Sequence, residues 1–238
     1  MPELVLSKKN ENVLILTLNR QEKGNSLTPE LLQQLVSHLD VAYSDPSLHA
    51  LCLTGAGRFF CTGADLNELG KANETRLREM FDSFSQAIEK LMAAPFLTAS
   101  LINGDCVGGG LGLALSTDYV LAADDSRLGT PEIAKGLFPF VIAKPLLQKI
   151  GSHRTMALFF GGKLISAAGA LSLGVISELI SRNQFSTRCE ELISHWNKAD
   201  SLLIRRGKET IQKEHSPELL RQYLFDAIKG IKDTSLLG

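Results

Sequence analysis

Apolar runs and amphipathic segments alternate along the chain as far as residue 124. Four apolar, β-rich runs predict strands, at 12–20, 47–57, 95–104 and 118–124. Helices are expected between them, at 26–43, at 74–92 and from about Gly109. Thr28 can cap the first helix with Pro29 at its first position, and 74–92 places apolar side chains at spacings of three and four. This order predicts an α/β fold with a largely parallel core.

The pattern changes to helices from about residue 144. Three short apolar segments end at glycines, which predicts short helices: KPLLQKIG, RTMALFFGG and SAAGALSLG. Longer helices are expected at 184–196, 199–213 and 216–231. We therefore predict one α/β core domain at 1–190 and a helical C-terminal region at 191–238.

Composition narrows the functional classes. The 238 residues carry a net charge of -1, so there is no global basic field for nucleic acid. No stretch has the length and apolarity of a membrane span, and no signal-peptide pattern is found. The four cysteines form no CxxC pair and the five histidines show no ligand spacing. We expect a cytoplasmic protein that binds no metal, nucleic acid or membrane.

Three adjacent glycines precede the helix expected near Gly109, in VGGGLGLALSTDY (107–119). Glycine weakens a helix by roughly 1 kcal/mol relative to alanine, so such a stretch is typical of a close approach to the backbone. The first amides of a helix lack intrahelical acceptors and lie at the positive end of its dipole. They offer a site for an anion or a developing oxyanion, with a purely structural glycine turn as the alternative.

Several segments together resemble one family. They are NRQEKGNSLTPELLQQL (19–35), RFFCTGADLNEL (58–69), INGDCVGGGLGLALSTDYVLAADDSRLGTPEIAKGL (102–137) and GGKLISAAGALSLGVISELI (161–180). They look like the crotonase family, the enoyl-CoA hydratases and isomerases. GAD and NGxxxGGG occur in the family's order, whereas GxGxxG, GxxxxGK[ST] and GxSxG are not matched.

The resemblance implies a spiral of ββα units, a C-terminal helical region that trimerises, and a pocket for an acyl-CoA thioester. It assigns two backbone oxyanion donors, the amides of Ala64 and Gly109. The expected partners are an acyl-CoA substrate and further copies of the chain, as a homotrimer or a dimer of trimers. No cofactor is expected beyond the CoA carried by the substrate.

The carboxylates favour one reaction within that family. Family hydratases place one glutamate two residues after GGG and a second in a PE dipeptide; here these positions are Gly112 and Glu132. Hydration uses both acids, whereas a double-bond shift needs only one, so Δ3–Δ2 enoyl-CoA isomerisation with Glu132 as acid/base is favoured. A hydratase, a hydrolase, a decarboxylase and an inactive acyl-CoA-binding member remain alternatives. The hydrolase pattern has an aspartate where Phe140 stands.

Further residues are candidates for binding the substrate. Lys23, beside Asn25, and Arg58 are the candidate cations for the CoA phosphates. By resemblance, Asp65 and Leu66 line the adenine or pantetheine path. Phe138 and Phe140 wall the acyl pocket or belong to the core. The full set of predicted substrate-binding residues is Lys23, Asn25, Arg58, Gly63, Asp65, Leu66, Gly108, Phe138 and Phe140.

Overall fold

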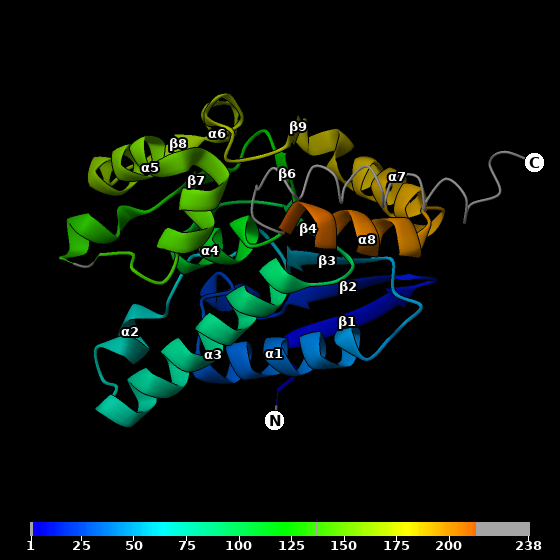
Figure 1. Ribbon diagram of the computed structural model, residues 1–238. Helices are drawn as coiled ribbons and strands as arrows, with labels where there is room; N and C mark the ends of the chain where they lie inside the picture. Colours follow the sequence, from blue (N-terminus) through cyan, green and yellow to red (C-terminus); the bar gives the residue numbers. More distant parts are fainter. Residues whose placement is uncertain (1, 137, 213–238) are drawn as a thin grey trace, which may run out of the picture.

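The computed structural model describes residues 2–136 and 138–212 (Figure 1). Its main sheet has six strands in the order β1-β2-β3-β4-β6-β9. Only the β1–β2 pair is antiparallel, and the other neighbours in this sheet are parallel. The strands are β1 (Val5–Asn10), β2 (Val13–Leu18), β3 (Ala50–Gly55), β4 (Leu97–Ile102), β6 (Tyr119–Ala123) and β9 (Glu178–Ile180). The four strands predicted from the apolar runs and their largely parallel order are thus confirmed.

A second, smaller sheet was not predicted. It joins β5 (Cys106–Val107), β7 (Arg127–Gly129) and β8 (Leu164–Ser166). β5 and β7 are parallel, and β7 and β8 are antiparallel. Strands of two or three residues are too short to show a period-2 pattern, which is why the sequence does not reveal them.

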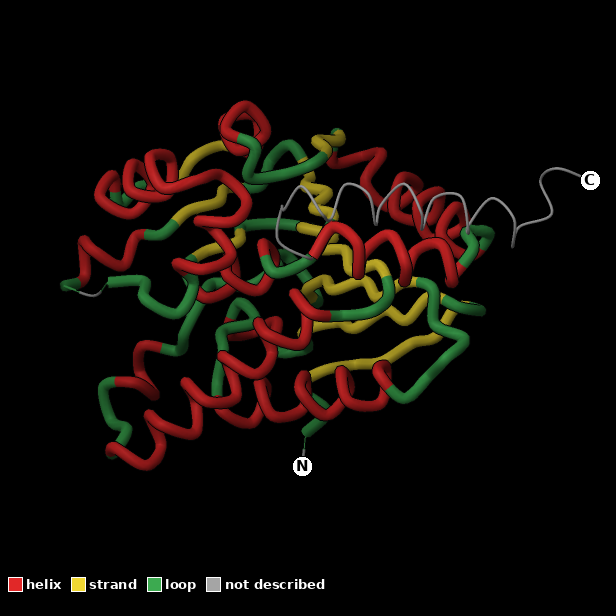
Figure 2. The backbone as a smooth tube through the Cα atoms, viewed as in Figure 1, coloured by secondary structure: helices red, strands yellow, loops and turns green. Residues whose placement is uncertain are grey.

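The helices follow the predicted segments closely (Figure 2). Helices and 3-10 turns of the described chain are η1 (Gln21–Lys23), α1 (Pro29–Tyr43), α2 (Leu66–Leu69), α3 (Glu74–Ala93), α4 (Gly109–Leu115), η2 (Pro131–Lys135), α5 (Ala143–Gly161), α6 (Ala167–Leu173), η3 (Arg182–Gln184), α7 (Phe185–Asn197) and α8 (Ser201–Gln212). Thr28 caps α1 by accepting from the Leu31 amide. α5 is interrupted at Gly151, where φ is +72°, so the predicted glycine stop is confirmed.

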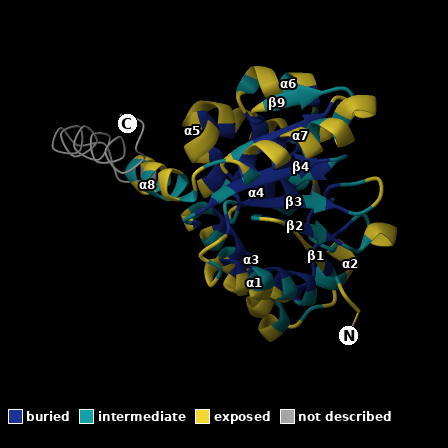
Figure 3. Ribbon diagram, turned by 90° about the vertical axis from the view of Figure 1, so that its right-hand side faces the viewer, coloured by how far each residue is buried: buried dark blue, intermediate teal, exposed yellow. Residues whose placement is uncertain are grey.

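Two apolar layers cover the main sheet. On one face, side chains of β2, β3 and β4 pack with α1, α3 and α4 in the larger core cluster. On the other face, α7 brings Leu192, Ile193 and Trp196 against side chains such as Cys52 and Ala99. Figure 3 shows β2, β3 and β4 buried between these layers. α4 starts after β4 and β5, so the first turn of α4 lies at the carboxyl end of the parallel strands.

The C-terminal predictions are partly covered by the described residues. α7 and α8 match the helices expected at 184–196 and 199–213, whereas the helix expected at 216–231 lies outside the described residues. α7 runs across residue 190, and the division into two domains there stays a prediction. No helix in 2–136 or 138–212 has both the length and the apolarity that a membrane span needs.

Candidate functional site

Two glycine-containing loops meet beside the start of α4. Cys61 and Cys106 form an isolated parallel bridge, in which the Val107 amide donates to the Cys61 carbonyl at 2.9 Å. Gly63 follows in one loop with φ of +87°. A Cβ atom there would lie 3.0 Å from the Val107 carbonyl oxygen and 3.4 Å from the nitrogen of Gly109. A side chain at position 63 would therefore push the two loops apart.

The amides of Ala64 and Gly109 are presented at this junction. Gly109 is the first residue of α4, where amides have no intrahelical acceptor. Among the described residues, none accepts a backbone hydrogen bond from the Ala64 or the Gly109 amide. The neighbouring Gly108 amide, in contrast, donates to the Gly129 carbonyl at 2.9 Å. The structure thus brings together the two loops that carry the predicted oxyanion donors.

Glu132 lies against the same loop. It belongs to η2, which packs on the end of α5: the Thr130 hydroxyl donates to the Leu158 carbonyl at 3.3 Å. A Cβ atom on Gly108 would lie 2.5 Å from Oε1 of Glu132, and Oε2 is buried. Since φ of Gly108 is +55°, glycine both adopts this backbone conformation and leaves room for the carboxylate.

The surroundings of Gly109 and Gly112 are apolar. A Cβ atom on Gly109 would lie 2.9 Å from Cδ1 of Leu27 and 3.3 Å from Cζ of Phe84. A Cβ atom on Gly112 would lie only 2.2 Å from Cγ2 of Ile142, which is 2% exposed. Hydrocarbon therefore fills the space where a longer side chain at position 112 would lie.

The sequence did not point to this apolar wall. Phe84 lies on the predicted apolar stripe of α3, but periodicity does not show which other elements that stripe touches. Ile142 lies before α5 and Leu27 before α1, and neither position was singled out by the motifs of the sequence. Only the packing of α3 and α5 against α4 brings these side chains together.

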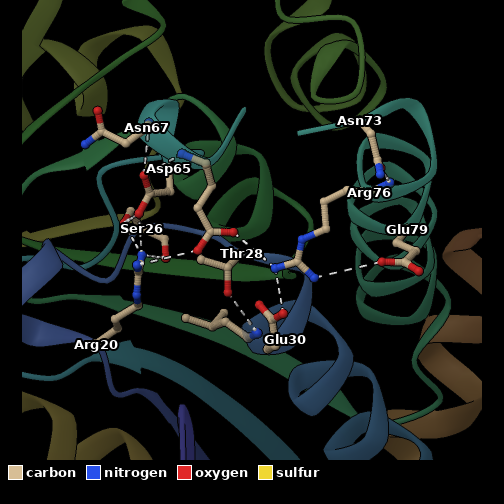
Figure 4. Close-up of polar contacts among 11 residues, drawn as sticks. Arg20, Ser26, Thr28, Glu30, Asp65, Asn67, Asn73, Arg76 and Glu79 are labelled. Atoms are coloured by element: carbon tan, nitrogen blue, oxygen red, sulfur yellow. Dashed lines mark hydrogen bonds and ion pairs between the residues drawn. The ribbon is translucent and has the colours of Figure 1, made fainter. Parts of the chain in front are cut away.

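A groove with a volume of about 390 Å³ opens beside α2. Its lining residues are Arg20, Lys23, Asp65, Asn67, Glu68, Lys71, Ala72 and Arg76. Four of these side chains are cationic and two are carboxylates. Arg20 pairs with Asp65 at 2.8 Å (Figure 4). Arg76 pairs with Glu68 at 3.1 Å. Both carboxylates therefore already have a cationic partner, which leaves Lys23 and Lys71 to give the groove its positive charge.

The remaining predicted binding residues lie in other surroundings. Asn25 is fully buried and donates to the carbonyls of Ala56 and Phe59 at 3.0 and 2.8 Å, so it braces the loop after β3. Arg58 is exposed over the Phe59 ring and does not line the groove described above. Their contact with a substrate stays a prediction.

Three other predicted residues lie in two separate places, Leu66 at the start of α2 and Phe138 and Phe140 before α5. Leu66 opens α2 and is 44% exposed. Phe138 packs its ring against Phe140 at 4.7 Å and against Phe159 at 5.5 Å, measured between ring centroids. Phe140 is 76% exposed. Phe138 thus contacts the core, whereas Phe140 lies outside it.

Other reactive groups near the junction are occupied or inert. Burial raises the pKa of the Cys61 thiol to about 12, so this thiol stays protonated at neutral pH and is no nucleophile. Asp105 accepts from the Arg127 amide at 2.9 Å and pairs with its guanidinium at 2.8 Å. Asp105 therefore stabilises the turn through its contacts with Arg127, and Glu132 is the carboxylate that lies at Gly108.

Comparison with known proteins identifies the family of the chain. The enoyl-CoA hydratase/isomerase family model matches residues 8–230. The chain is 31% identical to the 2,3-dehydroadipyl-CoA hydratase of Escherichia coli over 92% of this chain and 85% of the relative. It is 30% identical to an enoyl-CoA isomerase/hydratase of Mycosarcoma maydis over 87% of this chain and 79% of the relative.

A solved structure supports the same assignment. The enoyl-CoA hydratase of Bacillus anthracis superimposes with a TM-score of 0.89 at 26% identity, covering 97% of this chain and 91% of the other. The crotonase-like α/β fold expected from the sequence is thereby confirmed. With its fold, its paired glycine loops and the family match in agreement, the chain belongs to the enoyl-CoA hydratase/isomerase family of acyl-CoA enzymes.

Proposed function

We propose that this chain isomerises 3-enoyl-CoA thioesters to 2-enoyl-CoA thioesters. The amides of Ala64 and Gly109 bind the thioester oxygen, and Glu132 takes the proton from C2. The electron pair of that C–H bond moves toward the thioester oxygen, giving a dienolate whose negative charge the two amides stabilise. Glu132 then returns the proton to C4, and the double bond comes to lie between C2 and C3.

One observation carries the choice of reaction: Ile142 lies where a side chain of residue 112 would stand. Adding water to a double bond needs polar groups that hold and activate the water. Here the carboxylate of Glu132 lies against Gly108, whereas Leu27 and Phe84 lie against Gly109. A single carboxylate against a hydrocarbon wall suits the transfer of a proton between two carbons of the same substrate.

The groove beside α2 is proposed to take the anionic part of CoA. It adjoins Asp65, the residue after Ala64, so a thioester bound at the Ala64 amide would have its CoA part near this groove. Lys23 and Lys71 supply cations for phosphate groups.

No further cofactor is part of the proposal. The homotrimer implied by the resemblance is also a proposal, and sedimentation of the purified protein tests it.

Hydration of 2-enoyl-CoA is the second candidate, because the Escherichia coli relative carries the name of a hydratase. A panel of CoA thioesters separates the two: 3-hexenoyl-, 2-hexenoyl-, 3-hydroxyhexanoyl- and malonyl-CoA, with products identified by chromatography and mass. We expect interconversion of the two hexenoyl esters only. Formation of 3-hydroxyhexanoyl-CoA would favour the hydratase, and binding without turnover would indicate an inactive member.

A further inference from the structure

The side chain of Arg20 joins the two segments that hold Ala64. Its Nη1 atom donates to the Ser26 hydroxyl at 2.6 Å, to the Ser26 carbonyl at 3.2 Å and to Oδ2 of Asp65 at 2.8 Å. Figure 4 shows the guanidinium pointing at both partners. Ser26 precedes Leu27 and Asp65 follows Ala64, and Leu27 and Ala64 form an isolated parallel bridge. One guanidinium group thus clamps both sides of that bridge.

The bridge fixes the direction of the Ala64 amide. The Leu27 amide donates to the Gly63 carbonyl at 2.8 Å, and the Asp65 amide donates to the Leu27 carbonyl at 3.0 Å. The Gly63 carbonyl and the Ala64 N–H belong to one planar trans peptide, so they point in opposite directions. Since the carbonyl is held toward Leu27, the Ala64 N–H is turned away from Leu27.

The clamp is charged and largely shielded from solvent. The side chains of Arg20 and Asp65 are 16% and 11% exposed. Partial burial raises the pKa of Asp65, but hydrogen bonds from Arg20 and from the first amides of α2 outweigh this and lower it overall. Asp65 is therefore ionised at neutral pH, and its bond to Arg20 is a charge-assisted one.

We propose that Arg20 is a positioning residue: it keeps the Ala64 amide aimed at the thioester oxygen by clamping Ser26 and Asp65. The inference rests on the proposed function in one respect, that the Ala64 amide binds this oxygen. Arg20 acts through the bridge, and removing it lets the Ala64 peptide tilt without removing any donor.

The test replaces Arg20 and reads both turnover and the polarisation of a bound carbonyl. Arg20→Gln is expected to lower kcat for 3-hexenoyl-CoA by about 100-fold, as for misplacement of a catalytic group by about 1 Å. In infrared difference spectra, the thioester stretch of bound hexanoyl-CoA, labelled with ¹³C at C1, moves to lower wavenumber in the wild type. In Arg20→Gln the stretch is expected to return toward its value in water.

Rescue distinguishes positioning from general support of the fold. A single nitrogen of Arg20 makes the three hydrogen bonds to Ser26 and Asp65, whereas its Nη2 atom makes only a 4.0 Å ion pair with Glu68. The lysine of Arg20→Lys is therefore expected to restore most of the carbonyl shift and of kcat. Asp65→Asn keeps a capping side chain for α2 but removes the charge pair, and it should move the stretch in the same direction as Arg20→Gln by a smaller amount. This second variant keeps the test decisive if Arg20→Gln fails to fold.

Arg76→Gln is the matched control. Arg76 lines the same groove but pairs with Glu30 and Glu68 rather than with Ser26 or Asp65. Its loss is expected to raise KM and leave the carbonyl stretch where it is. The inference is overturned if Arg20→Gln keeps the wild-type stretch, or if Arg76→Gln moves it as far. Hexanoyl-CoA is unreactive, so this readout remains valid even if the wild type fails to isomerise 3-hexenoyl-CoA.

Discussion

The glycine-rich segment has a polar side, where the carboxylate of Glu132 lies against Gly108, and an apolar side, where Leu27 and Phe84 lie against Gly109 and Ile142 lies against Gly112. The side chains on both sides lie so close to this glycine-rich segment that they leave room only for its backbone. In the proposed reaction the polar side exchanges a proton with a substrate carbon, whereas the side chains of Leu27, Phe84 and Ile142 carry no hydrogen-bonding group that could hold water. We take this asymmetry as the basis for isomerisation, and the predictions that follow disturb one side at a time.

The largest effect is expected from neutralising the polar side. Glu132→Gln keeps the shape of the side chain but removes its capacity to accept a proton from C2, so kcat should fall by about 100- to 10,000-fold. Steady-state turnover of 3-hexenoyl-CoA measures it. Glu89→Gln, at an exposed position on α3, is the control and should retain wild-type turnover. Full activity of Glu132→Gln would remove Glu132 from the mechanism.

A smaller loss is expected when the carboxylate is displaced rather than removed. In Gly108→Ala the new methyl group would lie 2.5 Å from Oε1 of Glu132, so the carboxylate must move and kcat should fall by about 100-fold. Gly174→Ala is the matched control, because φ there is +76° and nothing lies within 4 Å of its Cβ position. Equal kinetic losses in both variants would attribute the effect to backbone strain alone.

Adding an acid to the apolar side should fail unless space is made for it. Gly112→Glu collides with Ile142 and should lower the free energy of unfolding by about 1–3 kcal/mol, as overpacked cores do. Combining it with Ile142→Ala should recover part of this stability and bring some hydration of 2-hexenoyl-CoA. Urea unfolding and product analysis measure both. If Gly112→Glu alone is as stable as the wild type, Ile142 does not fill that space.

The smallest effect concerns the Arg20–Asp65 pair and its dependence on pH. The pKa of Asp65 is lower in the folded chain than in the unfolded one, so the ionised carboxylate stabilises the fold above the ordinary aspartate value near 4. This contribution is lost as the pH falls through the folded pKa. Asp65→Asn should therefore cost about 1–2 kcal/mol of unfolding free energy at pH 7 and less below pH 4. A stability difference that does not change with pH would contradict the assignment.

The parts of the fold with long periodic patterns could be predicted from the sequence. The Thr-Pro start predicts α1, and the stripe of apolar residues predicts α3. Apolar runs bounded by turn residues predict β3 and β4. The strands of the small sheet could not be predicted in this way. Two or three residues of β5 or β7 carry no period, and their pairing depends on where the loops after β3 and β4 lie.

Some residues of the candidate site could likewise be predicted from the sequence, and others could not. Gly63, Gly108 and Glu132 could be named because their motifs resemble those of a family, and the structure brings their loops together. Ile142 could not be named, since an isoleucine before a helix is an ordinary core residue in any sequence. The position of Arg20 at the Ser26–Asp65 clamp likewise depends on side-chain direction after β2, which no spacing rule gives.

The most direct test follows one hydrogen through the reaction. The substrate is 3-hexenoyl-CoA carrying deuterium at C2, converted by the wild-type protein in ordinary water, with the product examined by NMR and mass spectrometry. If one carboxylate beside a hydrocarbon wall shuttles the proton, a measurable share of 2-hexenoyl-CoA carries deuterium at C4 and no water is added. A product whose newly added C4 hydrogen comes only from solvent, or 3-hydroxyhexanoyl-CoA in its place, would contradict the account.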